Sequence, residues 1–478
     1  MIATSAVLCA VIQHATSIGG DAFVLYHDAI SGRTFGLNAS GPAPAAATAD
    51  LLTRSANGRN AWSFTIPGIV GGWSELHKRF GTLSWYSLFA DAIEAAEGFP
   101  VSAVGLEAAR QIEPALRADA GNAALYFKSG ALMRPGDVLR QPALTNTLRA
   151  IADDGAEAFY QGSIARSICT AAHAKGGVAT AADFAGYKAE WAEPIETDYR
   201  GHTVRVMPPN SNGLLLLMQL NGLSGVSSDE LASHDVRRVG FMVRAMRSAF
   251  ELGRDFIAAP EANPPRPEAA LAAKLTAELQ RRVVEGAPAA KVETAGGTTC
   301  ITIADARGNA ISMVQSVMYS YGSAFLDPAT GVLMNSRLQG FSRDAGRPTS
   351  LAPGRRPPHT LNPVIVLANG RPRYLLTTPG GPNQTITNLQ VLSNLVDRKM
   401  QLGEAIDAPR WSISPKSEVL LESKFAETVE AGLKSAGIAA RRVDGAASFG
   451  SPKVVEIHPN GVLAGCVDVR RESQATAI

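Results

Sequence analysis

The run Ala295-Gly296-Gly297-Thr298-Thr299-Cys300 holds the residue types that a chain needs in order to cut itself. Two glycines before a threonine allow the tight backbone geometry that brings a hydroxyl onto the preceding carbonyl. Attack by Thr298 Oγ on the Gly297 carbonyl moves the acyl group from nitrogen to oxygen, and hydrolysis of that ester leaves Thr298 as a new N-terminus. Its α-amine, with a reference pKa of about 7.7 to 8.0, is then placed to act as base for its own hydroxyl. The sequence therefore predicts self-cleavage between Gly297 and Thr298.

Other interpretations of this stretch stay open. Two threonines entering a strand are also ordinary β-structure. Cys300 would point away from Thr299 in a strand, which favours a core residue over a nucleophile. A serine or cysteine hydrolase is a further alternative, but no Gly-x-Ser-x-Gly segment follows a predicted strand and no histidine is placed to activate Cys300.

Composition excludes several classes of function. The chain has 478 residues, of which 46% are hydrophobic, so it can bury a large core, and length alone suggests two or three domains. Lys and Arg number 45 against 43 Asp and Glu, without a basic block, so nucleic acid is not an expected partner. The four cysteines lie far apart without the spacing of metal ligands. We expect no disulfide framework, no metal and no cofactor.

No run of 18 apolar residues predicts a membrane-spanning helix. Ile2 to Ile12 is apolar, but no Lys or Arg precedes it and no small-residue cleavage site follows. We interpret this stretch as a buried helix rather than a signal peptide. A cytoplasmic protein is the resulting prediction.

Hydrophobic periodicity predicts a mixed fold. Strands are expected at Ala22–Tyr26, Thr34–Leu37, Lys188–Trp191, Ile195–Tyr199, Thr203–Met207, Ile301–Ala304, Ala310–Val317, Val364–Ala368, Arg373–Thr377, Val419–Leu421, Val454–Ile457 and Val462–Cys466. Helices are expected at Trp85–Glu97, Ala143–Gly155, Ser163–His173, Leu214–Leu220 and His234–Asp255. Residues 258–297 are rich in Ala, Pro and Glu, which indicates a surface helix, Pro267–Glu285, with flexible flanks before the predicted cut.

Eight short segments carry a resemblance because of their order along the chain. They are Ser17-Ile18-Gly19-Gly20-Asp21; Pro67-Gly68 with Gly72-Trp73; Phe159-Tyr160-Gln161-Gly162; Pro208-Pro209-Asn210-Ser211-Asn212-Gly213; Thr298-Thr299 with Asp305-Ala306-Arg307-Gly308-Asn309-Ala310; Gly340-Phe341-Ser342; Pro379-Gly380-Gly381; and Ala408-Pro409-Arg410-Trp411. Together they resemble the gamma-glutamyltranspeptidase family of N-terminal-nucleophile hydrolases.

The resemblance implies an α+β fold, a four-layer αββα sandwich. It also implies a self-processing amide hydrolase or acyltransferase, made as a proenzyme that acts on a small-molecule amide. Residues 1–297 and 298–478 would form a large and a small subunit of one domain, the second with 478 − 297 = 181 residues. The two pieces would stay associated, and the resemblance also allows a homodimer.

Four residues match the family's catalytic positions. Thr298 matches the nucleophile and Ser316 matches a hydroxyl residue that supports it. Gly380 and Gly381 match the oxyanion hole, where backbone N–H groups point at developing negative charge. Without the resemblance, Pro379-Gly380-Gly381 would be interpreted as a plain turn.

The sequence also departs from the family's substrate-binding pattern. The loop Asn38–Pro44 lacks the arginine that the family uses to hold glutamate, and Met318 stands where the family has asparagine. Gly340 replaces an acidic residue, and His359-Thr360 replaces a pair of serines. A glutamyl donor would lose the partners for both of its charged ends. The sequence thus resembles a branch that includes acylases and small-amide hydrolases such as oxamate amidohydrolase, and a non-catalytic descendant stays open.

Three residues are candidates for binding the substrate. Arg337 could replace the missing partner for a carboxylate, although it could equally be a surface arginine. His359 and Thr360 could line the acyl pocket, although a single loop histidine is more often structural. The neighbouring pair Arg355-Arg356 is interpreted as solvated.

Overall fold

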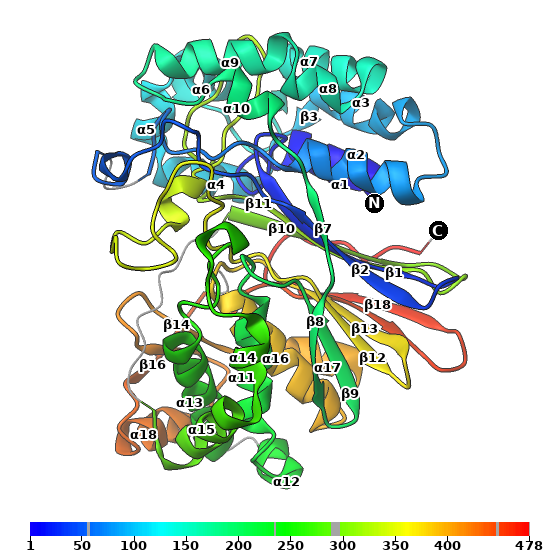
Figure 1. Ribbon diagram of the computed structural model, residues 1–478, viewed down its shortest axis with the longest axis vertical. Coiled ribbons are helices and arrows are strands. Elements are labelled where there is room, and N and C mark those ends of the chain that lie inside the picture. The colour runs from blue at the N-terminus through cyan, green and yellow to red at the C-terminus, as the bar shows by residue number, and fades with distance from the viewer. Residues whose placement is uncertain (55–57, 234–235, 288–296, 446–448, 478) are drawn as a thin grey trace.

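The computed structural model describes residues 1–478 apart from 55–57, 234–235, 288–296, 446–448 and 478. Two sheets of antiparallel strands lie next to each other at its centre (Figure 1). The first has the order β10-β11-β1-β2-β7, with strands Gly297–Ala304, Ala310–Met318, Asp21–Asp28, Arg33–Ala39 and Glu190–Ala192. The second has the order β18-β17-β13-β12-β9-β8, with strands Leu463–Val467, Lys453–Ile457, Arg371–Thr377, Val364–Ala368, His202–Val206 and Ile195–Tyr199.

Apolar side chains fill the space between the sheets. Phe23, Val314 and Cys300 form one row across β1, β11 and β10. They pack with Ile365 of β12 and Leu375 of β13 in a single buried cluster. Because side chains alternate along a strand, every second residue of β10 and β11 faces this cluster.

Helices cover the opposite face of the first sheet. Val24, Ile301 and Met313 on that face join a large apolar cluster with the helices above them in Figure 1. These helices are α1 (Ile2–Val11), α2 (Ile69–Phe80), α3 (Ala90–Glu97), α7 (Pro142–Asp154), α8 (Ala156–Tyr160), α9 (Ser163–His173) and α10 (Ala181–Ala185).

A second group of helices packs on the outer face of the second sheet. Val204, Val366 and Leu376 join that apolar cluster. Its helices, in the lower half of Figure 1, are α11 (Gly213–Leu223), α13 (Val236–Leu252), α15 (Ala273–Glu285), α16 (Asn383–Val396), α17 (Leu402–Asp407) and α18 (Glu427–Ser435).

Smaller elements complete the described chain. The helical ones are α4 (Ala103–Gln111), α5 (Glu113–Ala118), α6 (Ala120–Tyr126), α12 (Ser228–Ala232) and α14 (Pro267–Leu271). The strands are β3 (Phe99–Pro100) with β6 (Val138–Leu139), β4 (Phe127–Lys128) with β5 (Ala131–Leu132), and a three-stranded sheet of β14 (Trp411–Ile413), β15 (Val419–Glu422) and β16 (Ala440–Val443).

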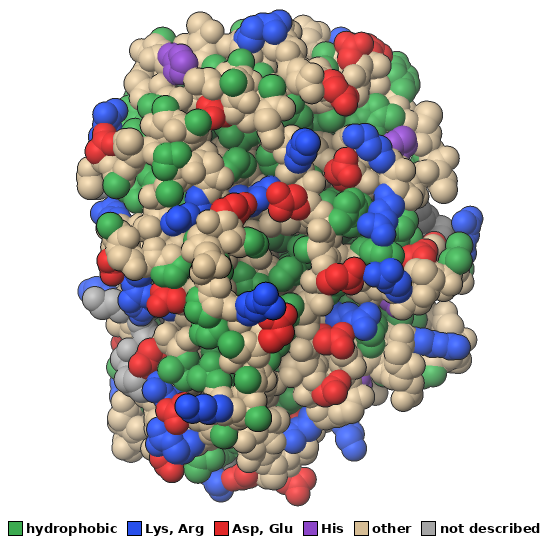
Figure 2. Space-filling view, viewed as in Figure 1, with side chains coloured by type: hydrophobic (Ala, Val, Ile, Leu, Met, Phe, Trp, Pro, Cys, Tyr) green, Lys and Arg blue, Asp and Glu red, His purple; other side chains and the backbone are tan. Residues whose placement is uncertain are grey.

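The surface matches the balanced composition. Lys and Arg side chains are interspersed with Asp and Glu over the face seen in Figure 2. Among the described residues, no helix combines the length and the apolar character needed to cross a bilayer.

The elements agree with the sequence-based expectation at the centre and differ at several of the outer helices. The predicted hairpin Ile301–Ala304 and Ala310–Val317 corresponds to β10 and β11, and β10 already begins at Gly297. The predicted helix Pro267–Glu285 is interrupted at Ala272, whose backbone is extended. Helices α16, α17 and α18 were not expected. Residues 288–296 of the predicted pre-cleavage segment lie outside the described residues.

Both sheets combine strands from the two sides of Gly297. In the first sheet, β1 lies directly between β2 and β11. In the second, β9 pairs with β12. A cut after Gly297 would therefore leave each sheet hydrogen-bonded and both apolar clusters intact.

We expect the two fragments of a chain cut after Gly297 to remain one particle. The cut protein should elute from a size-exclusion column with the uncut Thr298→Ala variant, even at about 1 M salt, because burial of apolar surface is not weakened by screening. Denaturant should separate the fragments. Elution of free 298–478 under native conditions would contradict this expectation.

Candidate active site

Three side chains stand in one row at the end of the first sheet. Asp21 of β1 lies opposite Ser316 of β11, and Ser316 lies opposite Thr298 of β10. Opposite residues in antiparallel strands project on the same side. This row continues the Phe23, Val314 and Cys300 row, so it faces the space between the sheets, and its three members are each at most 7% exposed.

The hydroxyl of Ser316 takes part in four hydrogen bonds with other described residues. Its Oγ donates to the carbonyl oxygen of Gly297. It accepts from the backbone N–H of Met318 at 2.7 Å, from Arg337 Nη2 at 3.2 Å and from Thr298 Oγ at 3.3 Å. One hydroxyl thus contacts both the predicted nucleophile and the carbonyl that it would attack.

The backbone around Ser316 is unusual for a strand. The ladder shifts register between Gly297 and Thr298, and Met318 adopts a positive φ of 77°. That conformation costs a bulky residue free energy, and such strain gathers at functional sites. A Cβ on Gly297 would lie 2.7 Å from the carbonyl oxygen of Tyr319, so glycine is required there.

A buried charge cluster lies behind Ser316. Arg337 Nε is 3.7 Å from Asp21 Oδ2, and His359 Nε2 is 3.3 Å from the same oxygen. All three side chains are at most 1% exposed. Asp21 was not among the predicted site residues, although an acidic residue at the start of the apolar strand after Gly19-Gly20 was a signal that could have indicated it.

Burial sets the ionisation of this cluster. It raises the pKa of Asp21 to about 7, against the opposing effect of the Arg337 charge. Burial lowers the pKa of Arg337 to about 10, and it lowers the pKa of His359 well below its usual value, helped by Arg337. His359 is therefore neutral at physiological pH and Arg337 stays charged, whereas Asp21 gains and loses its proton near pH 7.

Asn335 fixes the backbone that carries Arg337. Its Oδ1 accepts from the backbone N–H groups of Arg337 at 2.9 Å and Thr65 at 3.0 Å. Its Nδ2 donates to the carbonyl oxygens of Gly19 at 2.9 Å and Thr65 at 3.0 Å. A single buried amide thus ties three separate segments together beside the row.

The glycine loop follows β13. Gly380 and Gly381 have φ angles of 135° and 57°, in the region that favours glycine, and their carbonyl oxygens accept from the first turn of α16. A side-chain hydrogen bond between Cys300 and Thr377 joins the end of β13 to the strand that carries Thr298. The loop therefore begins next to β10, with its N–H groups free of the sheet ladder.

The other residues considered in the sequence lie outside the row of Asp21, Ser316 and Thr298. Thr360 is half-buried beside His359, and Gly340 lies against Pro357 and Pro358. The interpretation of Arg356 as solvated is wrong, because its side chain is buried. It donates to the carbonyl oxygen of Ser40 at 3.0 Å, and it pairs with two carboxylates, Glu190 and Glu261.

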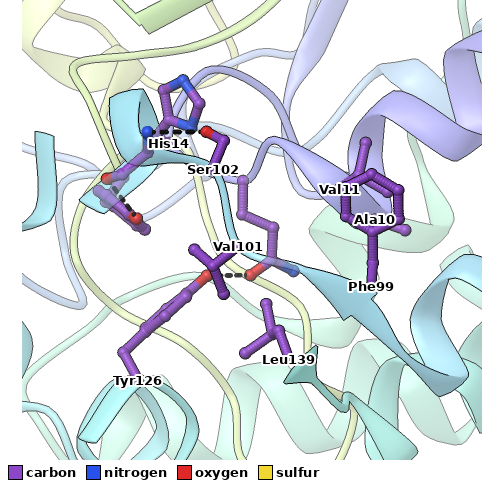
Figure 3. A pocket seen from close by; sticks show the side chains of 11 residues that line it. Ala10, Val11, His14, Phe99, Val101, Ser102, Tyr126 and Leu139 are labelled. Carbon is purple, nitrogen blue, oxygen red and sulfur yellow. Dashed lines mark hydrogen bonds between the residues drawn. The ribbon is translucent and has the colours of Figure 1, made fainter. Parts of the chain in front are cut away.

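Two nearby groups are poor catalytic candidates. Burial raises the pKa of Cys300 to about 11, which keeps its thiol protonated and disfavours a cysteine nucleophile. His14 lines a small separate pocket with Ser102 and Tyr126 (Figure 3). Burial and the charge of Arg471 lower the pKa of His14 to about 4. No cluster of metal-binding side chains occurs within the described part of the chain.

The raised pKa of Asp21 predicts how stability depends on pH. The folded state holds this proton up to a pH of about 7, whereas the unfolded chain releases it near its ordinary value of 3.8. The stability that Asp21 contributes is therefore present below 3.8 and lost as pH rises toward 7. We expect the free energy of unfolding of wild type minus that of Asp21→Asn to fall from pH 4 to pH 8.

Denaturant titrations in a Thr298→Ala background, where the chain should stay whole, measure this difference. The same difference measured in a His359→Gln background, which removes the imidazole but keeps the carboxylate, is the control and should still fall with pH, because the titration of His359 is absent from both members of that pair. A wild-type minus Asp21→Asn difference that does not change with pH would contradict the prediction.

Known proteins resemble this chain over its whole length. The gamma-glutamyltranspeptidase family model matches residues 1–478. A glutathione hydrolase-like YwrD proenzyme from Bacillus subtilis is 30% identical over 100% of this chain and 93% of its own. An oxamate amidohydrolase proenzyme from Klebsiella pneumoniae is 29% identical over 99% and 93%, respectively.

The solved structures agree with these relatives. A crystal structure of cephalosporin acylase from Bacillus halodurans superposes with a TM-score of 0.91 at 30% identity, covering 99% of this chain and 90% of that chain. The expectation of a mixed helix-and-sheet fold of this kind is thereby confirmed. The relatives named above carry the names of hydrolases and of an acylase. The chain belongs to the gamma-glutamyltranspeptidase family.

Proposed function

We propose that this protein is a self-processing amide hydrolase or acyltransferase that uses Thr298 as an N-terminal nucleophile. The observation that carries the proposal is the contact of Ser316 Oγ with both Thr298 Oγ and the Gly297 carbonyl oxygen. The word proenzyme in the names of both relatives supports a cut chain. The alternative that the row is ordinary strand structure does not account for a buried hydroxyl bonded at both of these atoms.

The cleavage step follows from these two hydrogen bonds. Thr298 Oγ forms a bond to the Gly297 carbon while its proton passes to Ser316, and Ser316 gives its own proton to the Gly297 oxygen. The carbon–nitrogen bond then breaks as the Gly297 oxygen returns its proton to Ser316 and re-forms the carbonyl, while Ser316 passes on the proton that it took from Thr298 to the leaving nitrogen. An ester now joins Gly297 to Thr298 Oγ, and the Thr298 nitrogen is a free amine. Water hydrolyses that ester to a Gly297 carboxylate and a Thr298 residue with a free α-amine.

The cut enzyme would then act on an external amide. The α-amine of Thr298 takes the hydroxyl proton as the oxygen attacks the substrate carbonyl, and it passes that proton to the leaving amine. The N–H groups of Gly380 and Gly381 stabilise the oxyanion. Water or a second amine then accepts the acyl group from Thr298.

The proposed chemistry fits a four-layer αββα sandwich of the N-terminal-nucleophile type. The two apolar helical clusters outside the sheets and the apolar cluster between them support this classification. The sharing of both sheets by residues 1–297 and 298–478 supports the association of the two fragments.

A small non-glutamyl amide is the substrate that the residues favour. The Asn38–Pro44 loop carries no arginine, and its polar groups bind internally, since Ser40 Oγ donates to Asn38 Oδ1 at 2.6 Å. Burying the ammonium and carboxylate of a glutamyl group without partners would cost several kcal/mol. The names oxamate amidohydrolase and cephalosporin acylase support the same choice.

Self-cleavage is tested by intact mass spectrometry of the purified protein. We expect two species, 1–297 and 298–478, the lighter beginning with Thr298. Thr298→Ala should remain a single chain because the attacking hydroxyl is gone, and Thr299→Ala is the matched control that should still be cut. A protein that stays whole, or a Thr298→Ala variant cut as the wild type is, would refute the proposal and favour a non-catalytic member.

The substrate class is tested by a side-by-side assay of the cut enzyme. We expect slow transfer from a γ-glutamyl anilide and slow turnover of glutathione, with faster hydrolysis of oxamate or a neutral acyl amide. The reason is the missing pair of charged partners for a glutamyl group. Efficient glutathione turnover, at about 10⁴ M⁻¹s⁻¹ or more, would overturn the choice of substrate and leave the cleavage proposal unaffected.

A further inference from the structure

Arg337 occupies a position that burial makes costly. Its guanidinium is 1% exposed, and among the described residues its Nε has no hydrogen-bond partner. The facing carboxylate, Asp21, is 3.7 Å from that nitrogen and also fully buried. A buried ion pair with imperfect geometry is weak evidence for a role in stability. The pair therefore calls for a functional explanation.

The Nη2 group of Arg337 contacts the hydroxyl that takes part in the proposed cleavage. It donates to Ser316 Oγ at 3.2 Å, and Ser316 in turn donates to the Gly297 carbonyl oxygen. A charged donor on a hydroxyl oxygen makes the hydroxyl proton a stronger hydrogen-bond donor, and in a low-dielectric site this polarisation is large. The positive charge of Arg337 thus reaches the Gly297 oxygen through one intervening hydroxyl.

We propose that Arg337, oriented by Asp21, is a positioning residue for the self-cleavage step and stabilises, through Ser316, the negative charge that develops on the Gly297 oxygen. This inference rests on the cleavage proposed above. In this proposal Arg337 and Asp21 act during self-cleavage, before any substrate binds. Asn335 supports the task by fixing the backbone N–H of Arg337 at 2.9 Å.

The competing role for Arg337 is to bind the carboxylate of a substrate. Its burial and its bond to Ser316 favour the internal role. Self-cleavage needs no substrate, so its rate separates the two roles. A residue that only binds substrate would leave that rate unchanged.

The experiment follows the full-length chain as it converts to fragments after pulsed in vitro translation. We expect Arg337→Met to slow the first-order rate by about 100- to 1000-fold, the effect typical of losing one oxyanion donor. The exposed Arg343 lies on the same segment, and Arg343→Met should cut at the wild-type rate. Circular dichroism and thermal melting establish that each variant is folded.

The Arg337→Lys variant tests the charge itself through the pH dependence of its cleavage rate, which a purely structural role of Arg337 would leave unchanged. Lysine keeps the charge but titrates when buried, so partial rescue should be lost as pH rises, beyond any pH effect in wild type. The groups facing this position are Asp21, His359 and Tyr319, with Arg356 behind Asp21. They are the same in both proteins, so the ratio of the two rates isolates the lysine.

Each outcome decides the proposal. Wild-type cleavage of a folded Arg337→Met chain, with Thr298→Ala still whole, would overturn the role of Arg337 and keep the proposed function. A wild-type chain that is never cut would refute both. If Arg337→Met does not fold, Asp21→Asn/Arg337→Met removes both charges and should be folded but slow; rapid cutting by this double variant would overturn the proposal.

Discussion

The candidate site depends on the register of β11 between β1 and β10. Because side chains alternate between the faces of a sheet, a slip of one residue on either side would move Asp21 or Thr298 to the helical face. Gly20 permits this register, since a Cβ there would lie 2.6 Å from the carbonyl oxygen of Ser316. In this register the hydroxyl of Ser316 contacts Thr298 and Gly297 of β10, and it also accepts from Arg337, which faces Asp21 of β1.

Much of this arrangement could be predicted from the sequence. Strands β10 and β11 are rich in the β-branched residues Thr, Ile and Val, which favour strands. The order of short motifs indicated Thr298, Ser316, Gly380 and Gly381 as candidates. Helix α16 could not be found this way, because its sequence is rich in Thr, Asn and β-branched residues, which favour other structures in isolation. Nearly all of its residues are buried, so tertiary packing rather than local propensity makes it a helix.

The burial of charged residues also could not be predicted from the sequence. Arg356 resembles a solvated arginine in a polar, proline-rich loop, yet the structure surrounds it with two carboxylates from distant segments. The side chains that Asp21 faces, Arg337 and His359, lie more than 300 positions away in the sequence. No local pattern reports such long-range pairing. A buried charge is recognised only when the groups that compensate it are seen together.

Strands from both sides of Gly297 share each sheet, and this affects how the molecule would unfold after a cut. Strands β1 and β11, which pair directly, would then belong to different chains, so unfolding would also be dissociation. The equilibrium between folded and unfolded forms would depend on protein concentration, as it does for obligate dimers. Refolding would require an encounter between two chains instead of loop closure within one. The intact chain is therefore the form that assembles this fold most readily. After the cut, each unfolding event also separates the two chains, and the fold is regained only when they meet again.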